Sequence, residues 1–157
     1  MTSPLHIALY EPDIPQNTGT VLRMAACLGL PVEVIEPCGF VWGGKHMRRS
    51  GMDYLDHVDV TRHLNWDTFE GNLPDQRRIL LSTKADQVYT EFDFHEGDIL
   101  ILGRESAGVP EEVHDAVDAR VTIPLKPGLR SFNLAIAAAM VVSEALRQLN
   151  AFPAHKT

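Results

Sequence analysis

The segment ILILGRESAGVPEEVHDAV, residues 99–117, carries the pattern on which the predicted fold depends. Ile99–Leu102 is a short, continuous apolar run, which is typical of a strand that is buried on both faces of a sheet. The polar loop that follows contains Gly103 and Gly108, and Val109–Val117 is predicted to be a helix. A strand followed by a loop and a helix is the repeating unit of a parallel sheet.

The same unit recurs on both sides of this segment. Helices are predicted over Val21–Leu28, which Gly29 and Pro31 would end, and over Ser131–Gln148, with Ser131 as the N-cap. The alternation of strands and helices predicts an α/β fold with a largely parallel sheet. Further strands are predicted at Leu5–Tyr10, Val32–Ile35, Ile79–Ser82 and Val121–Leu125, with short helices around a weak strand at Val58–Thr61.

Composition places the chain among ordinary globular proteins. It has 157 residues, 45% of them hydrophobic and 22% charged, and we expect residues 1–157 to form one domain. Cys27 and Cys38 are too few for a disulfide scaffold and are expected to be small core residues in a reducing cytosol. The start of the chain lacks a basic leader, and the longest apolar run, Leu134–Val142, is well short of the ~20 residues of a membrane span. We therefore expect a cytoplasmic protein with no membrane partner.

Several common catalytic motifs are absent. Gly103 and Gly108 have the spacing of a phosphate-binding loop, but Val109 and Pro110 stand where lysine and serine or threonine are required. The first loop, PDIPQNTG, lacks the glycines of a dinucleotide-binding fingerprint, and GRESAG lacks the G-x-S-x-G pattern of a hydrolase. The seven histidines show no metal-ligand spacing, so no metal is expected.

Three polar loops follow predicted strands: STKA from Ser82, GRESAGVP from Gly103 and PLKPGLRSFN from Pro124. In an open α/β sheet, ligands bind at the carboxyl ends of the strands. Glycines such as Gly108 and Gly128 would let the backbone approach a flat heteroaromatic ligand such as adenine closely. The alternative is that these glycines are ordinary turn residues, and spacing alone favours that interpretation.

Three ordered motifs resemble those of the SPOUT superfamily of RNA ribose methyltransferases. They are LYEPDIPQNTGTVLRMAACLG at residues 9–29, LGRESAGVP at 102–110 and IPLKPGLRSFNLAIAAAM at 123–140. The likeness extends over residues 5–149, including IEPCGFVW and MRRSGMDY, and is strongest to the enzymes that methylate the tRNA wobble nucleotide. It implies a parallel sheet with helices on both faces, a C-terminal trefoil knot and a homodimer. It also implies that the dimer itself forms the tRNA surface, because no RNA-binding domain is expected to be appended.

The resemblance further implies that S-adenosylmethionine, which leaves as S-adenosylhomocysteine, is bound by the three loops. Glu105 admits three roles: partner of an arginine across the dimer, contact to the cofactor, or loop cap. Ser131 and Asn133 either cap the last helix or bind the cofactor or substrate, or do both. Ser143 stands where relatives often carry tyrosine, so no role for an aromatic hydroxyl is carried over. The cofactor positions carried over from the motifs are Leu81, Ser82, Thr83, Gly103, Glu105, Gly108, Ile123, Leu125, Ser131 and Asn133.

Asn17 and Arg23 match the first motif, and the resemblance implies that both take part in catalysis, with Arg23 as the residue most often assigned to it. Methyl transfer to a ribose hydroxyl requires alignment of oxygen, methyl carbon and sulfur, and the hydroxyl proton must leave. A guanidinium stays protonated because its pKa exceeds ~12, so we expect Arg23 to orient the hydroxyl as a fixed cation and to hold a phosphate. Without the motif, an exposed helix arginine or an ion pair with Glu11 would be the simpler interpretation.

An acidic protein with a net charge of -7 must gather its positive charge locally to hold RNA. Positively charged residues are therefore candidates for contacts to RNA phosphates, and the resemblance adds Lys84 and Arg130 to those that charge alone suggests. For residues 45–49, a solvated helix face is an equally good explanation. Phe40 and Trp42 either stack on unpaired bases or pack in the core. The phosphate contacts suggested by charge are Lys45, His46, Arg48, Arg49, Arg62, His63 and Lys126.

The resemblance thus predicts a cytoplasmic, homodimeric methyltransferase that acts on the ribose 2′-hydroxyl of the wobble nucleotide, a cytidine or modified uridine in the anticodon region of tRNA. Leucine isoacceptors are the expected substrates. One alternative keeps the chemistry and moves it to another RNA or tRNA position. A second is an RNA-binding relative that retains the pocket without turnover.

Overall fold

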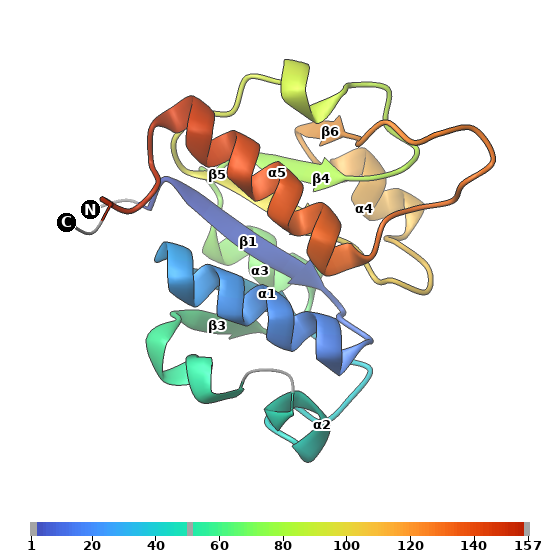
Figure 1. Cartoon of the computed structure of the whole chain (residues 1–157). Helices are drawn as coiled ribbons and strands as arrows, with labels where there is room; N and C mark the ends of the chain where they lie inside the picture. The colour runs from blue at the N-terminus through green and yellow to red at the C-terminus, as the bar shows by residue number, and fades with distance from the viewer. Residues whose placement is uncertain (1–2, 50–51, 156–157) are drawn as a thin grey trace.

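The computed structural model describes residues 3–49 and 52–155. Met1, Thr2, Lys156 and Thr157 lie outside it, as do Ser50 and Gly51 of the MRRSGMDY segment. A six-stranded sheet in the order β3-β2-β1-β5-β4-β6 forms the centre of the molecule (Figure 1). Every neighbouring pair of these strands is parallel, as predicted. The strands are β1 (Leu5–Tyr10), β2 (Val32–Ile35), β3 (Val60–His63), β4 (Arg78–Leu81), β5 (Asp98–Leu102) and β6 (Ala119–Val121).

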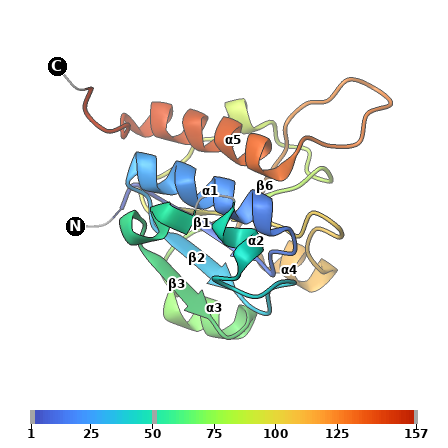
Figure 2. The ribbon, with the colours of Figure 1, turned by 60° about the horizontal axis from the view of Figure 1, so that its bottom comes forward.

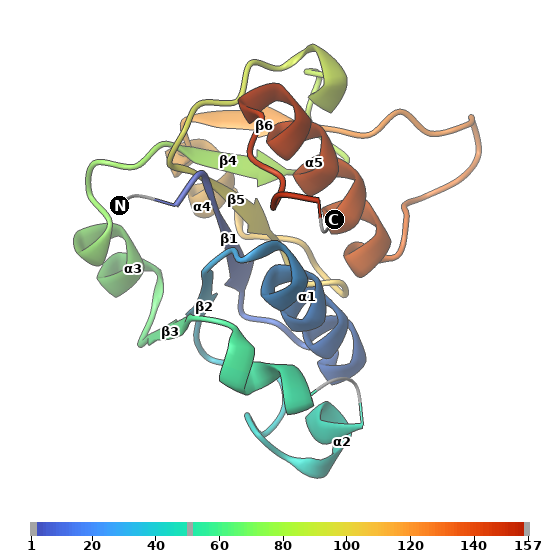
Figure 3. The same cartoon turned by 60° about the vertical axis from the view of Figure 1, so that its left-hand side comes forward.

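Helices cover both faces of the sheet, as Figures 2 and 3 show. The long helices α1 (Pro15–Leu28) and α5 (Leu134–Leu149) lie on one face, and α3 (Trp66–Asn72) and α4 (Glu111–Ala116) lie on the other. Because side chains alternate along a strand, β5 sends Leu102 into the core under α1 and α5, and Ile101 into the core under α3 and α4. The shorter helical segments are α2 (Lys45–Arg48), η1 (Met52–His57) and η2 (Tyr89–Glu91).

The continuous apolar runs reflect this two-sided burial. All five residues of β5 are buried, and this strand lies between β1 and β4 at the centre of the sheet. Leu9 of β1 stands opposite both Val34 of β2 and Leu102 of β5, so the ends of these three strands lie at one edge. Because β4 and β6 run parallel to β5, the loops after β4, β5 and β6, which the sequence predicts to bind a ligand, leave the sheet at the same edge.

Two helix ends show how local sequence sets the boundaries. Gly29 adopts a left-handed conformation (φ 68°) at the end of α1, as predicted. The prediction that Ser131 caps the last helix is wrong. Asn133 is the cap, because its Oδ1 accepts hydrogen bonds from the backbone N–H groups of Ala135 and Ile136 at 2.9 and 3.2 Å. Residues 131–132 consequently belong to the preceding loop.

The last strand is shorter than predicted and begins earlier. The run Val121–Leu125 is apolar, but β6 ends at Val121 because Thr122 leaves the pairing with β4. The Thr122 N–H instead donates to the carbonyl of Gln87 at 2.8 Å, and its carbonyl accepts from the Tyr89 N–H at 3.0 Å. The chain beyond β6 is therefore held by the loop between β4 and β5.

The two cysteines differ in their surroundings. Cys27 is exposed on α1, so the prediction that it is a core residue is wrong. Cys38 is half-buried against the core, and burial raises the pKa of its thiol to about 11, so the thiolate form is disfavoured. In the part of the chain that the structure describes, no helix is long and apolar enough to cross a membrane.

An ion pair between a buried carboxylate and a half-buried arginine is expected to be costly to break. The Asp98 carboxylate, 2% exposed, accepts hydrogen bonds from the Arg77 guanidinium at 2.6 and 2.9 Å and from the His95 N–H at 2.8 Å. Asp98→Asn is expected to lower the free energy of unfolding by about 3 kcal/mol, because it leaves the arginine charge without its partner. Urea denaturation measures the change, and Arg147→Gln, which breaks the exposed pair with Glu144, should alter it little. Equal losses in both variants would contradict the assignment.

Candidate functional site

A cavity of about 950 Å³ opens where the loops after β4, β5 and β6 meet. This volume suits a ligand of cofactor size. The ten cofactor positions carried over from the motifs all lie in its wall, although they come from three segments far apart in the sequence. They are Leu81, Ser82, Thr83, Gly103, Glu105, Gly108, Ile123, Leu125, Ser131 and Asn133.

The GRESAG loop closes tightly on itself. The Arg104 N–H donates to the Gly108 carbonyl at 2.9 Å, and the Gly108 N–H donates back to the Arg104 carbonyl at 2.8 Å. Gly108 adopts φ 59°, and a Cβ on Gly103 would lie 2.9 Å from the carbonyl carbon of Gly108. Both glycines are thus required by the backbone of this loop, which brings main-chain groups to the cavity wall.

Asp13, in the loop after β1, anchors the GRESAG loop. Its carboxylate accepts hydrogen bonds from the Ser106 hydroxyl and from the Glu105 N–H at 3.1 Å. Burial alone would raise the pKa of Asp13, but these hydrogen bonds to the ionised form outweigh it and lower the pKa below its usual value. Asp13 is therefore held as a carboxylate beside the cavity.

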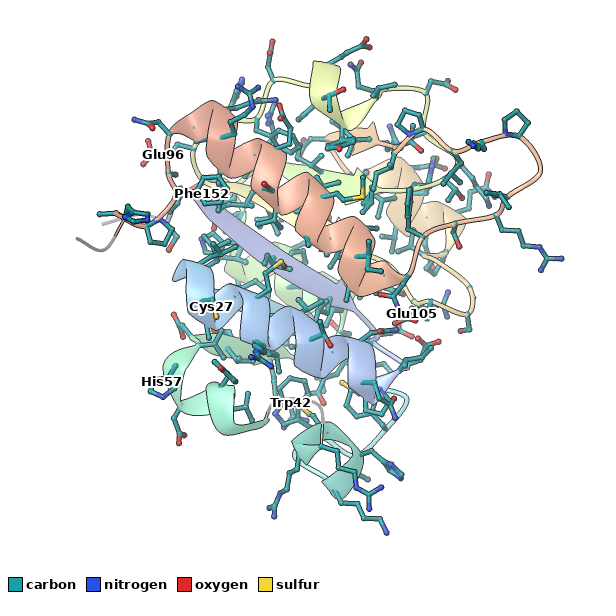
Figure 4. The ribbon with its side chains drawn as sticks, in the orientation of Figure 1. Cys27, Trp42, His57, Glu96, Glu105 and Phe152 are labelled. Carbon is teal, nitrogen blue, oxygen red and sulfur yellow. The ribbon has the colours of Figure 1, made fainter. Side chains whose placement is uncertain are left out.

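Three polar side chains from the three motifs meet at one point. The Asn17 side-chain amide, in the first turn of α1, donates to Oε2 of Glu105, and the Asn133 amide donates to Oδ1 of Asn17 at 3.1 Å. Figure 4 shows Glu105 at the ends of α1 and α5 that face the loops. Burial raises the pKa of Glu105, the Asn17 bond lowers it, and the nearby Asp13 charge raises it further, so the net direction is upward.

Arg23 does not join this group within one chain. It follows Asn17 by six residues, which places it about 9 Å further along the helix and about 240° around its axis. Its guanidinium lies on the exposed side of α1, 5.0 Å from the ring centre of Tyr54 in η1, and not in the cavity wall. The ion pair with Glu11, which the sequence left open, is not formed.

The candidate RNA-contacting residues fall into two groups at the loop edge of the sheet. Lys84, Lys126 and Arg130 are exposed on loops that border the cavity. Lys45, Arg48 and Arg49 are exposed on and after α2, which is anchored by the buried Met47, and His46 lies among them.

Two of the charge-based suggestions have other partners. The prediction of a phosphate contact at His63 is wrong, because this side chain is 2% exposed and bonds Glu33 at 2.8 Å. Arg62 is paired with Glu36 at 2.6 Å. A single sequence does not show either pairing, because both join neighbouring parallel strands or their ends.

Phe40 and Trp42 contact each other with ring centres 6.5 Å apart, and both pack against the core. The Arg62 guanidinium lies 5.4 Å from the Trp42 ring centre. These contacts favour the packing role that the sequence left open beside base stacking.

Several cavity residues were not predicted, among them Arg104, His114 and Phe132. Arg104 and Phe132 directly adjoin predicted positions, so their place in the motifs would have indicated them. His114 lies on α4, and no pattern in the sequence connects that helix to the cavity. Among residues 3–49 and 52–155, no group of three or more His, Cys, Asp or Glu side chains is arranged to hold a metal ion.

Comparison with known proteins places this architecture among RNA-modifying enzymes. The model of the SpoU rRNA Methylase family matches residues 4–143. The chain is 58% identical to a tRNA (cytidine(34)-2′-O)-methyltransferase of Beijerinckia indica, over 92% of each chain. It is 42% identical to the enzyme of the same description in Escherichia coli, over 92% of this chain and 94% of that one.

Solved structures agree with this likeness. A structure described as giving insight into 2′-OH methylation of C/U34 on tRNA superposes with a TM-score of 0.88 at 41% identity, covering 93% of this chain and 96% of that chain. An AdoMet-bound rRNA methyltransferase from Sinorhizobium meliloti superposes with a TM-score of 0.86 at 24% identity, covering 95% of this chain and 58% of that chain. The second likeness, at this identity, speaks for the fold alone.

The closed GRESAG loop predicts a stability difference between two glycine substitutions. Gly103→Ala places a methyl group against the Gly108 backbone and is expected to cost about 1 to 3 kcal/mol of the free energy of unfolding. At Gly71 in α3, an added Cβ would meet no neighbouring atom within 4 Å, so Gly71→Ala should be neutral or slightly stabilising. Thermal unfolding of both variants checks this, and a Gly103→Ala protein as stable as the wild type would contradict the close approach.

Proposed function

The chain belongs to the SpoU rRNA Methylase family, and from that premise we propose that it methylates the ribose 2′-hydroxyl of nucleotide 34 in tRNA. The observation that carries the proposal is 58% identity, over 92% of both chains, to a tRNA (cytidine(34)-2′-O)-methyltransferase. Nucleotide 34 is the wobble position, so the tRNA partner is bound through its anticodon region. We propose leucine isoacceptors as substrates and the cytoplasm as the compartment, both on the resemblance alone.

The cavity fits S-adenosylmethionine as the methyl donor. Leu81, Ile123 and Leu125 offer an apolar wall for the adenine, and Ser82 and Ser131 offer hydroxyls for polar groups. Gly103 and Gly108 leave no side chain between the backbone and a ligand at the loop after β5. When bound, S-adenosylmethionine supplies a methyl group already activated by a sulfonium, so no metal is required.

The protein's own residues contribute by holding the loop after β5 and the RNA in place. Asp13 and Asn17 fix residues 105–106 at the cavity wall, so that the reacting oxygen meets a preorganised loop. Positioning of this kind can lower a barrier by roughly 7 to 11 kcal/mol. Arg23, on the exposed side of α1, is suited to hold an RNA phosphate rather than to touch the reacting atoms of the same chain.

The C-terminal trefoil knot implied by the resemblance is also part of the proposal. It is supported by the contacts of residues 121–122 with both Ser82 and the 87–89 segment of the loop that joins β4 to β5. Gln148 of α5 bonds the same loop at the Phe92 carbonyl (2.8 Å) and the Phe94 N–H (2.9 Å). The C-terminal part of the chain thus contacts the loop between β4 and β5, which precedes it in the sequence, as a knot at the C-terminus requires.

A homodimer is proposed on the exposed surface of α5. Ile136 is 55% exposed and Phe132, just before the helix, 39% exposed, while Ala139 and Ser143 complete an outward face with small side chains. Large exposed apolar side chains that lie close together mark interaction sites. A serine at 143 keeps this face flat, and the dimer would present the basic residues of both chains to one tRNA.

The direct test is incubation of purified protein with S-adenosylmethionine and total tRNA, followed by mapping of the methylated nucleoside. We expect 2′-O-methylcytidine or a 2′-O-methylated uridine at position 34. Methylation at another position would move the activity to a different RNA site. Cofactor binding without transfer to any RNA would identify an RNA-binding relative that retains the pocket.

Arg23→Ala is expected to reduce kcat/KM for tRNA by about 10- to 100-fold, the range set by loss of a charge-assisted hydrogen bond of about 1.5 to 3 kcal/mol. Affinity for S-adenosylhomocysteine should stay unchanged, because Arg23 does not line the cavity. The kcat/KM of Arg23→Lys should lie between those of the wild type and Arg23→Ala, because lysine keeps the positive charge but cannot donate two parallel hydrogen bonds to a phosphate. Calorimetry and steady-state kinetics measure these effects, and a parallel loss of cofactor affinity would place Arg23 in the cofactor site instead.

Ile136→Glu is expected to convert the dimer to monomers, because it buries a charge in an apolar interface. Sedimentation velocity measures the shift. Leu64→Glu is the matched control, since Leu64 is 74% exposed after β3 and outside the proposed interface. If Ile136→Glu and Leu64→Glu both sediment as dimers, like the wild type, then α5 is not part of the dimer interface.

A further inference from the structure

The proposed reaction requires a proton acceptor, and none of the residue roles described above supplies one. The ribose hydroxyl must lose its proton as its oxygen takes the methyl group, and a positioned base normally accepts it. Arg23 does not fill this role, because its guanidinium remains protonated and lies outside the cavity wall. The acceptor is therefore sought among the titratable groups that line the cavity.

Six titratable side chains line the cavity. Glu111 and Asp115 are exposed on α4, where water solvates them. His114 has its Nε2 buried, and its Nδ1 lies 3.7 Å from Oδ1 of Asp115, so both ring nitrogens face the protein. Lys84 and Arg104 carry positive charge and do not accept a proton. The sixth side chain is Glu105.

We propose that Glu105 is the general base that accepts the ribose 2′-hydroxyl proton. This inference rests on the proposed function. Glu105 follows β5 by three residues, in the loop whose shape Gly103 and Gly108 enforce. The Asn17 amide holds Oε2, which fixes the carboxylate and leaves Oε1 as its second acceptor. Asn133 holds Asn17 in turn at 3.1 Å, so one residue from each motif defines the position of the carboxylate.

The surroundings of Glu105 favour a carboxylate of increased basicity. Burial is the largest influence on its pKa and raises it, and the ionised Asp13 raises it further. The side chain that α1 brings to Glu105 is the neutral amide of Asn17, and Asn133 at the start of α5 bonds that amide in turn. Arg104, the adjacent cation, is directed away, onto the Gly108 carbonyl at 3.0 Å and the Tyr10 ring at 5.6 Å. Within one chain, among residues 3–49 and 52–155, no cationic side chain contacts the Glu105 carboxylate.

The proton transfer balances in atoms and charge. The O–H bond of the ribose breaks, its proton passes to a Glu105 oxygen, and the electron pair stays on the ribose oxygen for the new bond to carbon. The bond from that carbon to sulfur breaks with its pair on sulfur. A carboxylate, an alcohol and a sulfonium thus become a carboxylic acid, an ether and a thioether, and Glu105 then releases its proton to water.

The decisive variant is Glu105→Gln, which keeps the size of the side chain and an oxygen for the Asn17 bond. We expect kcat to fall by about 100-fold or more, the contribution typical of a general base. Affinity for S-adenosylhomocysteine should stay within about threefold by calorimetry, because a neutral amide still fills the same space. Glu96→Gln is the matched control, since Glu96 is exposed at the opposite end of the sheet from Glu105, as Figure 4 shows, and its activity should equal that of the wild type.

A measurement on the free protein tests the same residue without turnover. A raised pKa means that the folded state disfavours the ionised carboxylate, so ionised Glu105 lowers stability above its folded pKa and no longer does so below its unfolded pKa. Glu105→Gln should therefore melt at a higher temperature than the wild type at neutral pH, and the difference should shrink as the pH falls through the folded pKa. Carboxyl carbon NMR of the wild type, assigned with the variant, should give that pKa directly.

The outcomes separate this inference from the proposed function. Wild-type protein that methylates no RNA defeats both. An active wild type with an equally active Glu105→Gln variant overturns the base alone. A variant that loses turnover and S-adenosylhomocysteine affinity by the same factor would make Glu105 a cofactor contact, and this also overturns the proposal.

Discussion

The pairing of β1 with β5 at the centre of the sheet is the constraint on which the site depends. These strands are 93 residues apart at their ends, Leu9 and Leu102, and their register places the two carboxyl ends side by side. Only then does Asp13 reach residues 105–106 and Asn17 reach Glu105. A shift of one residue in this register would exchange the two faces of β5 and separate the loops. The apolar runs that build the core therefore also assemble the polar site.

The sequence predicts the skeleton of the fold well because two-sided burial leaves a plain signal. Leu5–Tyr10 and Val32–Ile35 are confirmed as strands with the predicted bounds. Boundaries failed where a tertiary contact overrides local pattern, as at Val121, where the chain turns to the 87–89 segment although the apolar run continues to residue 125. Asn133, and not Ser131, caps the last helix, because α5 begins at Leu134 and Oδ1 of Asn133 accepts from the Ala135 and Ile136 N–H groups.

The sequence predicts which residues line the cavity better than it predicts how the candidate site residues are arranged in space. Ordered motifs bring the cofactor positions together because a short motif fixes local backbone, and the parallel sheet collects the three loops at one edge. Arg23 shows the limit of this reasoning: a motif gives proximity in sequence, whereas the helix carries Arg23 away from Asn17 and onto Tyr54. His63 failed for a related reason, since its partner Glu33 lies on a neighbouring strand that no sequence spacing reveals.

The distribution of charge reconciles an acidic chain with two ligands of opposite sign. The carboxylates of Asp13 and Glu105 are half-buried beside the cavity, where partial burial strengthens their field and a positively charged sulfonium would be favoured. Lys126 and Arg130 are exposed on the loop before α5 and do not line the cavity, so they can contact phosphates, and salt would screen them. Lys84 is exposed at the rim of the cavity. If the cations lay in the cavity and the carboxylates on the exposed loops, the RNA phosphates would face carboxylates and the positively charged methyl donor would face cations. The half-buried carboxylates and the exposed cations Lys126 and Arg130 thus lie at the same loop edge of the sheet but at different depths.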